Sequence, residues 1–516
     1  MDGVQGRTER SVDLLVVGGG VNGCGIARDA AGRGLSVLLC EQGDLAGATS
    51  QASSKLVHGG LRYLERGEFR LVRESLAERE VLLASAPHII RPLRFVLPHH
   101  PGLRPAWMLR LGLLLYDHLG RRRRLPASRS VALRRDPAGN PLQPRYVRGF
   151  EYSDCWVDDA RLTALLAVDA AERGASVLTR TRLEKAVRED GGWRATLISG
   201  DGDGGEGGRS TTVRARAVVN AAGPWVAEAL ARCGLGAPRI AVRLVKGSHV
   251  VTPRLYEGAQ AYTLQSSDGR VVFTLPYEGG FTLIGTTEAP YAGDPAQATA
   301  SAEETEYLLG VVGDYFERRP APSDVVWSYA GVRPLHDDGR ASASAVTRDY
   351  VFDLDAGPAR APILSVYGGK ITTFRRLAEH ALSDLGKAMP VPGRPWTARA
   401  PLPGGDIPGG EVEAFAAARQ AERPWMDARM MRRLCRAYGT RVEAVLHGAK
   451  GPGDLGEDLG AGLSERELDY LRAKEWARTA EDVLWRRSKL GLHMTPAQRE
   501  AVARRMQAVR APSGAP

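Results

Sequence analysis

The sequence lacks an apolar run long enough to cross a membrane, and its first ten residues lack the apolar core of a secretion signal. The longest apolar stretch, residues 107–119, is interrupted by Arg110, Asp117 and His118. We therefore expect neither a transmembrane nor a secreted chain. Attachment to the surface of a membrane is still compatible with these features.

Cysteine is scarce. The 516 residues include five cysteines, an odd number, and no two of them have the CxxC spacing of a metal or redox site. This pattern predicts reduced, buried thiols of a cytosolic protein, and we expect no metal site. The five are Cys24, Cys40, Cys155, Cys233 and Cys435.

Nucleic-acid motifs and interleaved aromatic and basic residues are also missing, which argues against a nucleic-acid binder. The net charge of +10 favours anionic substrates or anionic lipid, although a generally arginine-rich proteome would give the same excess. The apolar fraction of 43% and the charged fraction of 25% are typical of folded protein, and the length predicts about two or three domains.

What the sequence does contain is a glycine turn within residues 12–41. An apolar run leads into Gly18, Gly20 and Gly23, and a helix-compatible segment and a second apolar run follow, ending at Glu41. This order predicts the strand, turn, helix and strand of a dinucleotide-binding unit. The glycines allow a tight turn, a close approach to the pyrophosphate and close helix packing, and Glu41 is spaced to bind a ribose. NAD and FAD fit this pattern equally well.

A polar loop follows, and an amphipathic helix is expected over residues 69–84. We expect the loop to lie against the phosphates and the planar ring of the nucleotide, whereas the simpler alternative is a serine-rich surface loop. Its hydroxyl and ionisable side chains are Thr49, Ser50, Ser53, Ser54, Lys55, His58, Arg62 and Tyr63.

The apolar residues 107–119 are predicted to form a helix, and four arginines follow at residues 121–124. An apolar helix beside a basic cluster could contact anionic lipid. A buried helix with a solvated basic loop is the commoner arrangement, and we favour it.

Two later segments have the same predicted order of strand, glycine turn and helix as the first one. Gly223 follows a predicted strand, and Gly369 with Lys370 lies between a strand and a helix within residues 363–378. Residues 152–171 read as a helix and residues 175–179 as a strand of the same sheet. Alternating residues 242–252 and 271–287 predict antiparallel strands of a second sheet that covers the nucleotide.

Ten motifs in this order resemble the aerobic, FAD-dependent glycerol-3-phosphate dehydrogenase family over nearly the whole chain. The departures are the first few residues and residues 121–145 and 200–208. The motifs are GGGVNGCGIARDAAGRGLSVLLCE, ATSQASSKLVHGGLRYLE, FEYSDCWVDDARL, NAAGPWV, LVKGSHVV, IGTTE, GVRPL, RDY, SVYGGKITTFRRLAEHAL and, at residues 482–489, DVLWRRSK.

The resemblance implies an enzyme that oxidises sn-glycerol 3-phosphate to dihydroxyacetone phosphate by hydride transfer from C2 to N5 of an extended FAD. It also implies that a membrane quinone takes the electrons, and that the enzyme is a homodimer attached peripherally to the cytoplasmic face of the membrane.

The expected fold is α/β with three parts. They are a Rossmann-like FAD-binding domain (residues 1–85, 150–240 and 328–395), an antiparallel-sheet substrate or cap domain (86–149 and 241–327) and a C-terminal helical domain (396–516). The expected cofactor contacts are the turn glycines, Glu41, the loop at residues 49–58 and Lys370.

By the same resemblance, the substrate pocket contains Arg62, Tyr63, His249, Arg333 and Lys370, with Arg333 as the main phosphate ligand. We expect His249, Lys370 and Arg333 to be the catalytic set. A base must remove the hydroxyl proton as the hydride leaves, and the sequence does not rank His249 against Lys370, with His58 as a further candidate.

Three alternatives stay open at this point. An amine or amino-acid oxidase shares the nucleotide turn and the covering sheet, although two arginines and a lysine suit a phosphate dianion better than a single carboxylate. A glycerol-phosphate oxidase would pass the electrons to oxygen. A flavoprotein scaffold without catalysis is the third.

Overall fold

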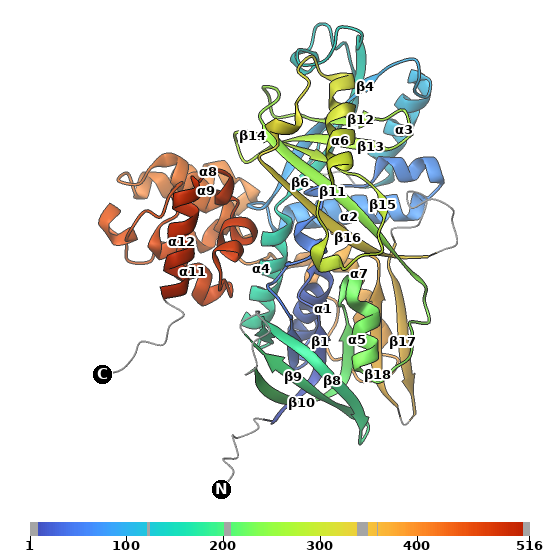
Figure 1. The fold of residues 1–516 in the computed structure, drawn as a ribbon, viewed down its shortest axis with the longest axis vertical. Helices are drawn as coiled ribbons and strands as arrows, with labels where there is room; N and C mark the ends of the chain where they lie inside the picture. Colours follow the sequence, from blue (N-terminus) through green and yellow to red (C-terminus); the bar gives the residue numbers. More distant parts are fainter. Residues whose placement is uncertain (1–8, 121–123, 201–207, 338–348, 359, 509–516) are drawn as a thin grey trace.

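The computed structural model describes residues 9–120, 124–200, 208–337, 349–358 and 360–508. Figure 1 shows three parts: a sheet with α1 and α5 at its sides near the N-terminus, a second sheet beyond it with α6 and α3, and a cluster of helices at the C-terminus. The predicted basic cluster lies outside the described residues except for Arg124, and so does most of the glycine-rich stretch at residues 201–207.

The first sheet has eight strands, and its centre is parallel in the order β18-β10-β1-β2-β7. The edge strand β17 and the β8–β9 pair are antiparallel additions. The bounds are β1 (Glu9–Val17), β2 (Val37–Cys40), β7 (Ser176–Leu178), β8 (Thr181–Glu189), β9 (Gly192–Ser199), β10 (Arg209–Asn220), β17 (Val351–Gly357) and β18 (Arg360–Tyr367).

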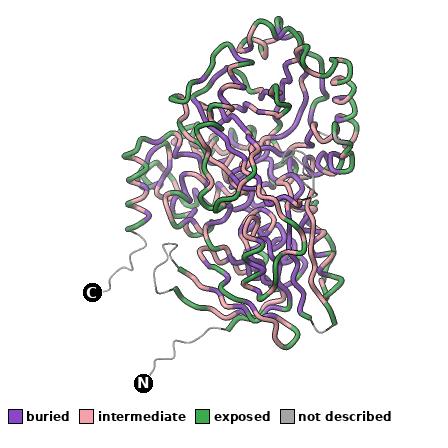
Figure 2. The backbone as a smooth tube through the Cα atoms, turned by 45° about the vertical axis from the view of Figure 1, so that its right-hand side comes forward, coloured by how far each residue is buried: buried purple, intermediate pink, exposed green. Residues whose placement is uncertain are grey.

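The central strands read as unbroken apolar runs because both faces of this sheet are covered. Leu14 and Val16 of β1 pack on one face with the helices α1 (Val21–Gly32), α4 (Asp159–Glu172) and α7 (Phe374–Leu385). Leu15 and Val17 point to the other face, which the β8–β9 pair and α5 (Val226–Arg232) cover. Figure 2 shows the resulting buried interior.

The second sheet has ten strands along the path β15-β11-β14-β13-β12-β4-β6-β3, with β16 on β11 and β5 on β6. Its pairs are antiparallel except for β4 with β12, so the sheet is mixed rather than purely antiparallel as predicted. The bounds are β3 (Leu56–Val57), β4 (Ile90–His99), β5 (Arg129–Val131), β6 (Arg148–Val157), β11 (Val242–Pro253), β12 (Ala261–Gln265), β13 (Val271–Tyr277), β14 (Phe281–Gly285), β15 (Ala289–Pro290) and β16 (Trp327–His336).

Helix α6 (Ala302–Tyr315) packs on one face of this sheet, and α2 (Phe69–Ser85) and α3 (Ala106–Leu119) pack on the other. A buried carboxylate connects the second sheet to the helices α2 and α3. Asp154 of β6 accepts hydrogen bonds from Arg79 of α2 (2.7 Å) and from Tyr116 of α3 (2.8 Å). This contact fixes both helices over the sheet.

The structure corrects four predictions. Residues 152–157 form a strand rather than a helix. Strands β6 and β16 both belong to the ten-stranded sheet, where β6 pairs with β4 and β16 with β11, although the expected boundaries place them in the nucleotide domain. Helix α3 is not buried: only Leu113 and Tyr116 are, whereas Trp107 is 66% and Leu111 57% exposed. Helix α7 begins at Phe374, so residues 371–373 form a turn after Lys370.

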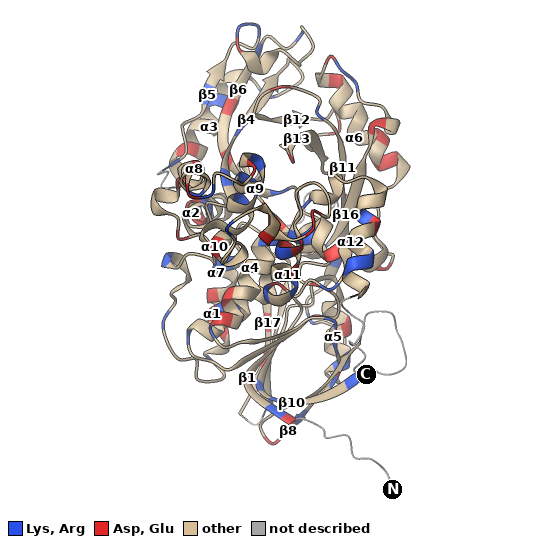
Figure 3. Ribbon diagram, turned by 90° about the vertical axis from the view of Figure 1, so that its left-hand side faces the viewer, with Lys and Arg blue, Asp and Glu red and all other residues tan. Residues whose placement is uncertain are grey.

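The C-terminal part is helical, as predicted. Its helices are α8 (Val412–Glu422), α9 (Ala428–Tyr438), α10 (Val442–Val445), α11 (Glu465–Lys474), a π-helix (Asp482–Arg487) and α12 (Pro496–Ala508), and they enclose an apolar core of their own. Figure 3 shows basic and acidic residues side by side around α4, α10 and α11.

All five cysteines are buried and free, as predicted, and burial raises the pKa of Cys40 and of Cys233 to about 12. Within the described residues, no helix is long and apolar enough to cross a membrane, and no group of three or more His, Cys, Asp or Glu residues could hold a metal ion.

Candidate active site

A cavity of about 810 Å³ lies along the carboxyl ends of β1, β10 and β18, where the three predicted glycine turns meet. Gly18, Gly20, Gly223 and Gly369 line it. Ligands of open parallel sheets bind at this edge, and the N-terminus of α1 suits an anion there.

The first turn requires its glycines for steric reasons. A Cβ on Gly23 would lie 1.9 Å from the carbonyl oxygen of Gly18, so α1 could not pack as close to the turn. Gly18 has a φ of +112°, and a Cβ there would lie 2.4 Å from the oxygen of Ala221. Gly23 does not line the cavity itself; its role is to bring the helix close.

Glu41 lines the cavity at the end of β2, where the sequence predicts a ribose ligand. Its Oε2 accepts a hydrogen bond from the N–H of Gly19 (2.6 Å), and its Oε1 accepts one from Gly43 (2.7 Å). Burial raises the pKa of this carboxyl above its ordinary value. The two backbone bonds hold the carboxylate in one orientation.

The hydroxyl loop also lines the cavity, and protein groups hold it in place. Thr49 donates to the carbonyl of Val332 (2.6 Å), and the N–H of Val21 donates to Ser50 (2.9 Å). Ser53 donates to Asp159 (2.7 Å). The loop is therefore tied to the second sheet and to the helices α1 and α4.

Lys55 does not line the cavity, although the sequence places it among the cofactor contacts. Its side chain is 1% exposed and lies behind the loop, 2.8 Å from the carboxylate of Asp159. Its Nζ also stands 4.6 Å from the centre of the Tyr329 ring. These contacts fit a residue that fixes the loop from behind.

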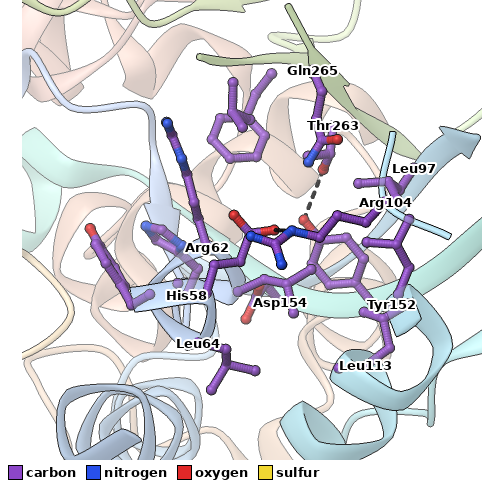
Figure 4. A pocket seen from close by; sticks show the side chains of 18 of the residues that line it. His58, Arg62, Leu64, Leu97, Arg104, Leu113, Tyr152, Asp154, Thr263 and Gln265 are labelled. Carbon is purple, nitrogen blue, oxygen red and sulfur yellow. Dashed lines mark hydrogen bonds and ion pairs between the residues drawn. The ribbon is translucent and has the colours of Figure 1, made fainter. Parts of the chain in front are cut away.

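A second cavity of about 400 Å³ adjoins the first one, and Ser54, His58, Tyr63 and Arg333 line both. Figure 4 shows it with His58 and Arg62 on one side and Leu97, Thr263 and Gln265 facing them. A small substrate at the junction could therefore touch a bound nucleotide and these polar side chains together.

Arg333 on β16 is a cation at this junction, and its side chain is 20% exposed. Its Nη1 has no hydrogen-bond partner in the structure and lies 3.9 Å from Glu288. Gly247 on the neighbouring strand β11 makes room for it, because a Cβ there would lie 2.7 Å from Nη2 of Arg333. Burial lowers the pKa of Arg333, although a guanidinium stays charged at neutral pH.

His249 lies one layer behind the junction. Its ring is fully buried, it stacks on Tyr329 at 4.8 Å, and its Nε2 is 2.9 Å from the hydroxyl of Ser54. Burial and the charges of Lys55 and Arg333 lower its pKa well below the ordinary value, so the ring is neutral. His249 lines neither cavity and reaches them only through Ser54.

The other predicted substrate residues do come together at the cavities. Lys370 lines the nucleotide cavity, and its Nζ stands 3.7 Å from the centre of the Tyr63 ring. Arg62 lines the smaller cavity and donates to the carbonyl of Gly269 (2.7 Å). His58 lines both cavities and packs edge-on against Phe273.

Sequence reasoning missed several residues that line the cavities. Asp154 and Phe273 belong to strands of the second sheet, and recognising residues 148–157 as an alternating strand could have indicated Asp154. Arg180, Asp482 and Arg486 come together only through the fold. No local pattern links them. Thr286 and Glu288 lie in the IGTTE motif, whose individual side chains were not singled out.

The residues present suit a dinucleotide. The glycine turns leave a cradle that side chains would fill, Glu41 faces the ribose position, and the buried donor Nη1 of Arg180 lies at the same end without a hydrogen-bond partner. The smaller cavity then lies at the opposite, ring-bearing half of such a ligand, next to Lys370 and His58.

Comparisons with known proteins agree with this geometry. Residues 13–375 match the family described as FAD dependent oxidoreductase, and residues 395–514 match the C-terminal domain of alpha-glycerophosphate oxidase. A glycerol-3-phosphate dehydrogenase of Pseudomonas aeruginosa is 55% identical over 495 residues, which are 96% of this chain and 95% of that protein.

Two further relatives are informative. A D-erythritol 1-phosphate dehydrogenase of Brucella abortus is 53% identical over 489 residues, covering 95% of this chain and 96% of that protein. The structure of a glycerol-3-phosphate dehydrogenase from Bacillus halodurans, complexed with FAD, matches with a TM-score of 0.75 at 28% identity and covers 98% of this chain and 91% of that one.

Proposed function

The chain belongs to the FAD-dependent glycerol-3-phosphate dehydrogenase family, and we propose that it oxidises C2 of sn-glycerol 3-phosphate to give dihydroxyacetone phosphate. The observation that carries this proposal is Arg333, whose side chain is 20% exposed and lines both the nucleotide cavity and the smaller cavity. The cofactor is FAD, which accepts a hydride at N5 when bound.

Arg333 binds the phosphate in this proposal. The Arg333 side chain lines both cavities, and phosphate oxygens there would accept charge-assisted hydrogen bonds from its guanidinium. Arg62 and Lys370 line the adjoining walls and add positive charge, which suits a dianion better than the single carboxylate of an amino acid. Tyr63 packs against Lys370 and limits where its ammonium group can move.

His58 takes the hydroxyl proton in this proposal. A general base must come within hydrogen-bond reach of that proton, and of the three candidates His58 alone lines both cavities with an imidazole. His249 lies 2.9 Å from the Ser54 hydroxyl and so fixes the position of the Ser54 side chain, which lines both cavities. Lys370 stays with the phosphate and the flavin ring.

The electron acceptor is a membrane quinone in this proposal. The smaller cavity leads from the Arg333 junction to Phe69, Met108, Leu111 and Leu115, which are exposed apolar side chains on α2 and α3. An apolar acceptor dissolved in a bilayer could enter along this wall without crossing water.

The exposed face of α3 docks on an anionic bilayer in this proposal. Trp107, Met108, Leu111, Leu114 and Leu115 are 36–66% exposed on one helix, and the exposed Arg104 contacts Met108 at 3.8 Å. An apolar stripe bordered by arginine is the arrangement of an interfacial helix. The enzyme would then be peripheral to the cytoplasmic face of the membrane and, by resemblance, a homodimer.

Anaerobic titration of the purified yellow protein with glycerol 3-phosphate tests the reaction. We expect the flavin absorbance to bleach, and no bleaching would exclude the dehydrogenase. D-erythritol 1-phosphate, the substrate named for one relative, should be tested beside it, because a higher kcat/KM for the erythritol ester would replace glycerol 3-phosphate as the substrate. Reoxidation rates with a quinone analogue and with oxygen distinguish a dehydrogenase from an oxidase.

Sedimentation with vesicles of anionic lipid tests the membrane surface. The double variant Leu111→Glu, Leu115→Glu should lose binding but keep anaerobic flavin reduction, while Val147→Glu, at another exposed apolar position, should bind normally. Equal binding of all three proteins would exclude α3 as the contact. Sedimentation velocity in detergent checks the predicted homodimer.

A further inference from the structure

The C-terminal helical domain supplies one wall of the nucleotide cavity. Thr479, Glu481, Asp482 and Arg486 line it together with Glu41 of the first sheet. Because Glu41 is spaced to bind a ribose, these residues lie at the adenosine end of a bound FAD. That end of the site is therefore built from two domains that are distant in the sequence.

Buried ion pairs join the two domains at this point. Asp44, in the loop after Glu41, accepts bonds from Nε of Arg486 (2.6 Å) and from Nη2 of Arg487 (2.7 Å). Asp482 accepts bonds from Nη2 of Arg486 (2.5 Å) and from Nη2 of Arg180 (2.6 Å). The side chains of Asp482 and Arg487 are fully buried, so solvent does not screen these pairs.

Arg180 forms hydrogen bonds with both the first domain and the C-terminal helical domain. It lies between β7 and β8 with a φ of +50°, and its N–H donates to the carbonyl of Gly43 (2.8 Å). Its Nη2 is held by Asp482, whereas its Nη1 is buried, has no hydrogen-bond partner and is 3.9 Å from Asp44. The guanidinium is therefore held by the C-terminal domain at the wall of the cavity that Arg180 lines.

We propose that Asp482 and Arg486 hold Arg180 and the Asp44 loop against the adenosine half of FAD, so that docking of the C-terminal domain and retention of the cofactor are coupled. Arg180 touches the adenosine moiety from the wall of the cavity, and Asp482 is a positioning residue that acts through Arg180. This inference depends on FAD and not on the identity of the substrate, so its test is independent of the proposed reaction.

Stability alone does not account for the arrangement. A buried ion pair often contributes little because desolvation offsets the attraction, and an unpartnered buried donor is unfavourable. Asp482 binds Arg180 and Arg486 at the wall of the nucleotide cavity, where a ligand can contact their side chains.

The ratio of the dissociation constants for FMN and FAD tests the proposal, because only FAD carries the adenosine half. Full-length protein is freed of flavin, and the quenching of flavin fluorescence is measured during titration with each flavin. In Asp482→Asn, the FMN-to-FAD ratio should fall by about tenfold or more, the effect of one charge-assisted bond. FAD should also dissociate faster from the diluted holoenzyme.

The matched control is Glu413→Gln, which removes a half-exposed carboxylate of the same domain that pairs with Arg432 and Arg436. It should leave the ratio unchanged. An unchanged ratio in Asp482→Asn would overturn the proposal, and so would an equal loss of FMN and FAD affinity, which indicates general loosening.

Arg180→Gln covers the case in which Asp482→Asn does not fold, because Asp482 keeps its partner Arg486 in this variant. The same fall in the FMN-to-FAD ratio is expected, with an unchanged pattern of limited proteolysis. An unaltered FMN-to-FAD ratio in Arg180→Gln would exclude the contact between Arg180 and the adenosine moiety.

Discussion

Replacing Arg333 with alanine is the most direct test of how the substrate is held. The variant removes a largely buried guanidinium whose Nη1 has no protein partner, and water from the adjoining cavities can fill the space of the lost side chain. The fold should tolerate the change, because the 3.9 Å contact with Glu288 is the ion pair that is lost. FAD content should stay at the wild-type level.

The magnitude follows from the bonds that the guanidinium can make. Two charge-assisted bonds to a phosphate, each contributing about 1.5–3 kcal/mol, sum to roughly 3–6 kcal/mol. Since about 1.36 kcal/mol corresponds to a factor of ten, kcat/KM for glycerol 3-phosphate should fall by about 10²- to 10⁴-fold. Arg333→Lys should recover part of the loss through its charge but not through the planar fork.

Anaerobic stopped-flow reduction of the flavin provides the assay, with glycerol 3-phosphate and with glycerol, which has no phosphate. The rate constant for glycerol should be almost the same in both proteins, so the preference for the phosphate ester collapses in Arg333→Ala. Arg318→Ala, an exposed arginine of the second domain, is the control. An equal loss with both substrates would refute the phosphate role and indicate a general disturbance of the site.

Three further outcomes are expected. Gly23→Ala should purify with little FAD and a lower Tm, because its Cβ would lie 1.9 Å from the oxygen of Gly18; wild-type flavin absorbance per protein would contradict this. His58→Gln should lower the rate of flavin reduction by about 10²- to 10⁴-fold, and the rise of that rate with pH that a general base produces should disappear. An unchanged pH profile would indicate that His249 or Lys370 is the base instead. The third concerns acid: despite burial, the charges of Arg486 and Arg180 hold the pKa of Asp482 well below its ordinary range. Its contribution to stability is present above the unfolded value of about 3.9 and is lost as the pH falls toward the folded pKa, so Asp482→Asn should show a flatter loss of Tm below pH ~4. Parallel acid curves would exclude this contribution.

Much of the nucleotide site follows from local sequence. An apolar run followed by glycine, as at residues 12–23, has few conformations available, because the strand, the turn and the helix form from neighbours in the chain. The same logic holds for the turns at Gly223 and Gly369, and for Glu41 at the end of the next strand. These local features are therefore sufficient to predict the FAD-binding fold and the protein family.

The surroundings of the site depend on the tertiary structure. Strands β6 and β16 belong to the second sheet because of partners far away in the sequence, and an apolar helix such as α3 has the same pattern whether it faces a core or a bilayer. The placement of His249 behind Ser54 likewise requires β11 to pack against the hydroxyl loop.

The sequence by itself therefore determined where a nucleotide is held, because backbone geometry at glycine is a local property. The tertiary structure alone decided which side chains converge on that nucleotide. Arg180 and Asp482 are 302 residues apart, and no periodicity in the chain records their contact. Such contacts arise when separate cores dock, and they depend on the shape and charge of surfaces that form only after each domain has folded.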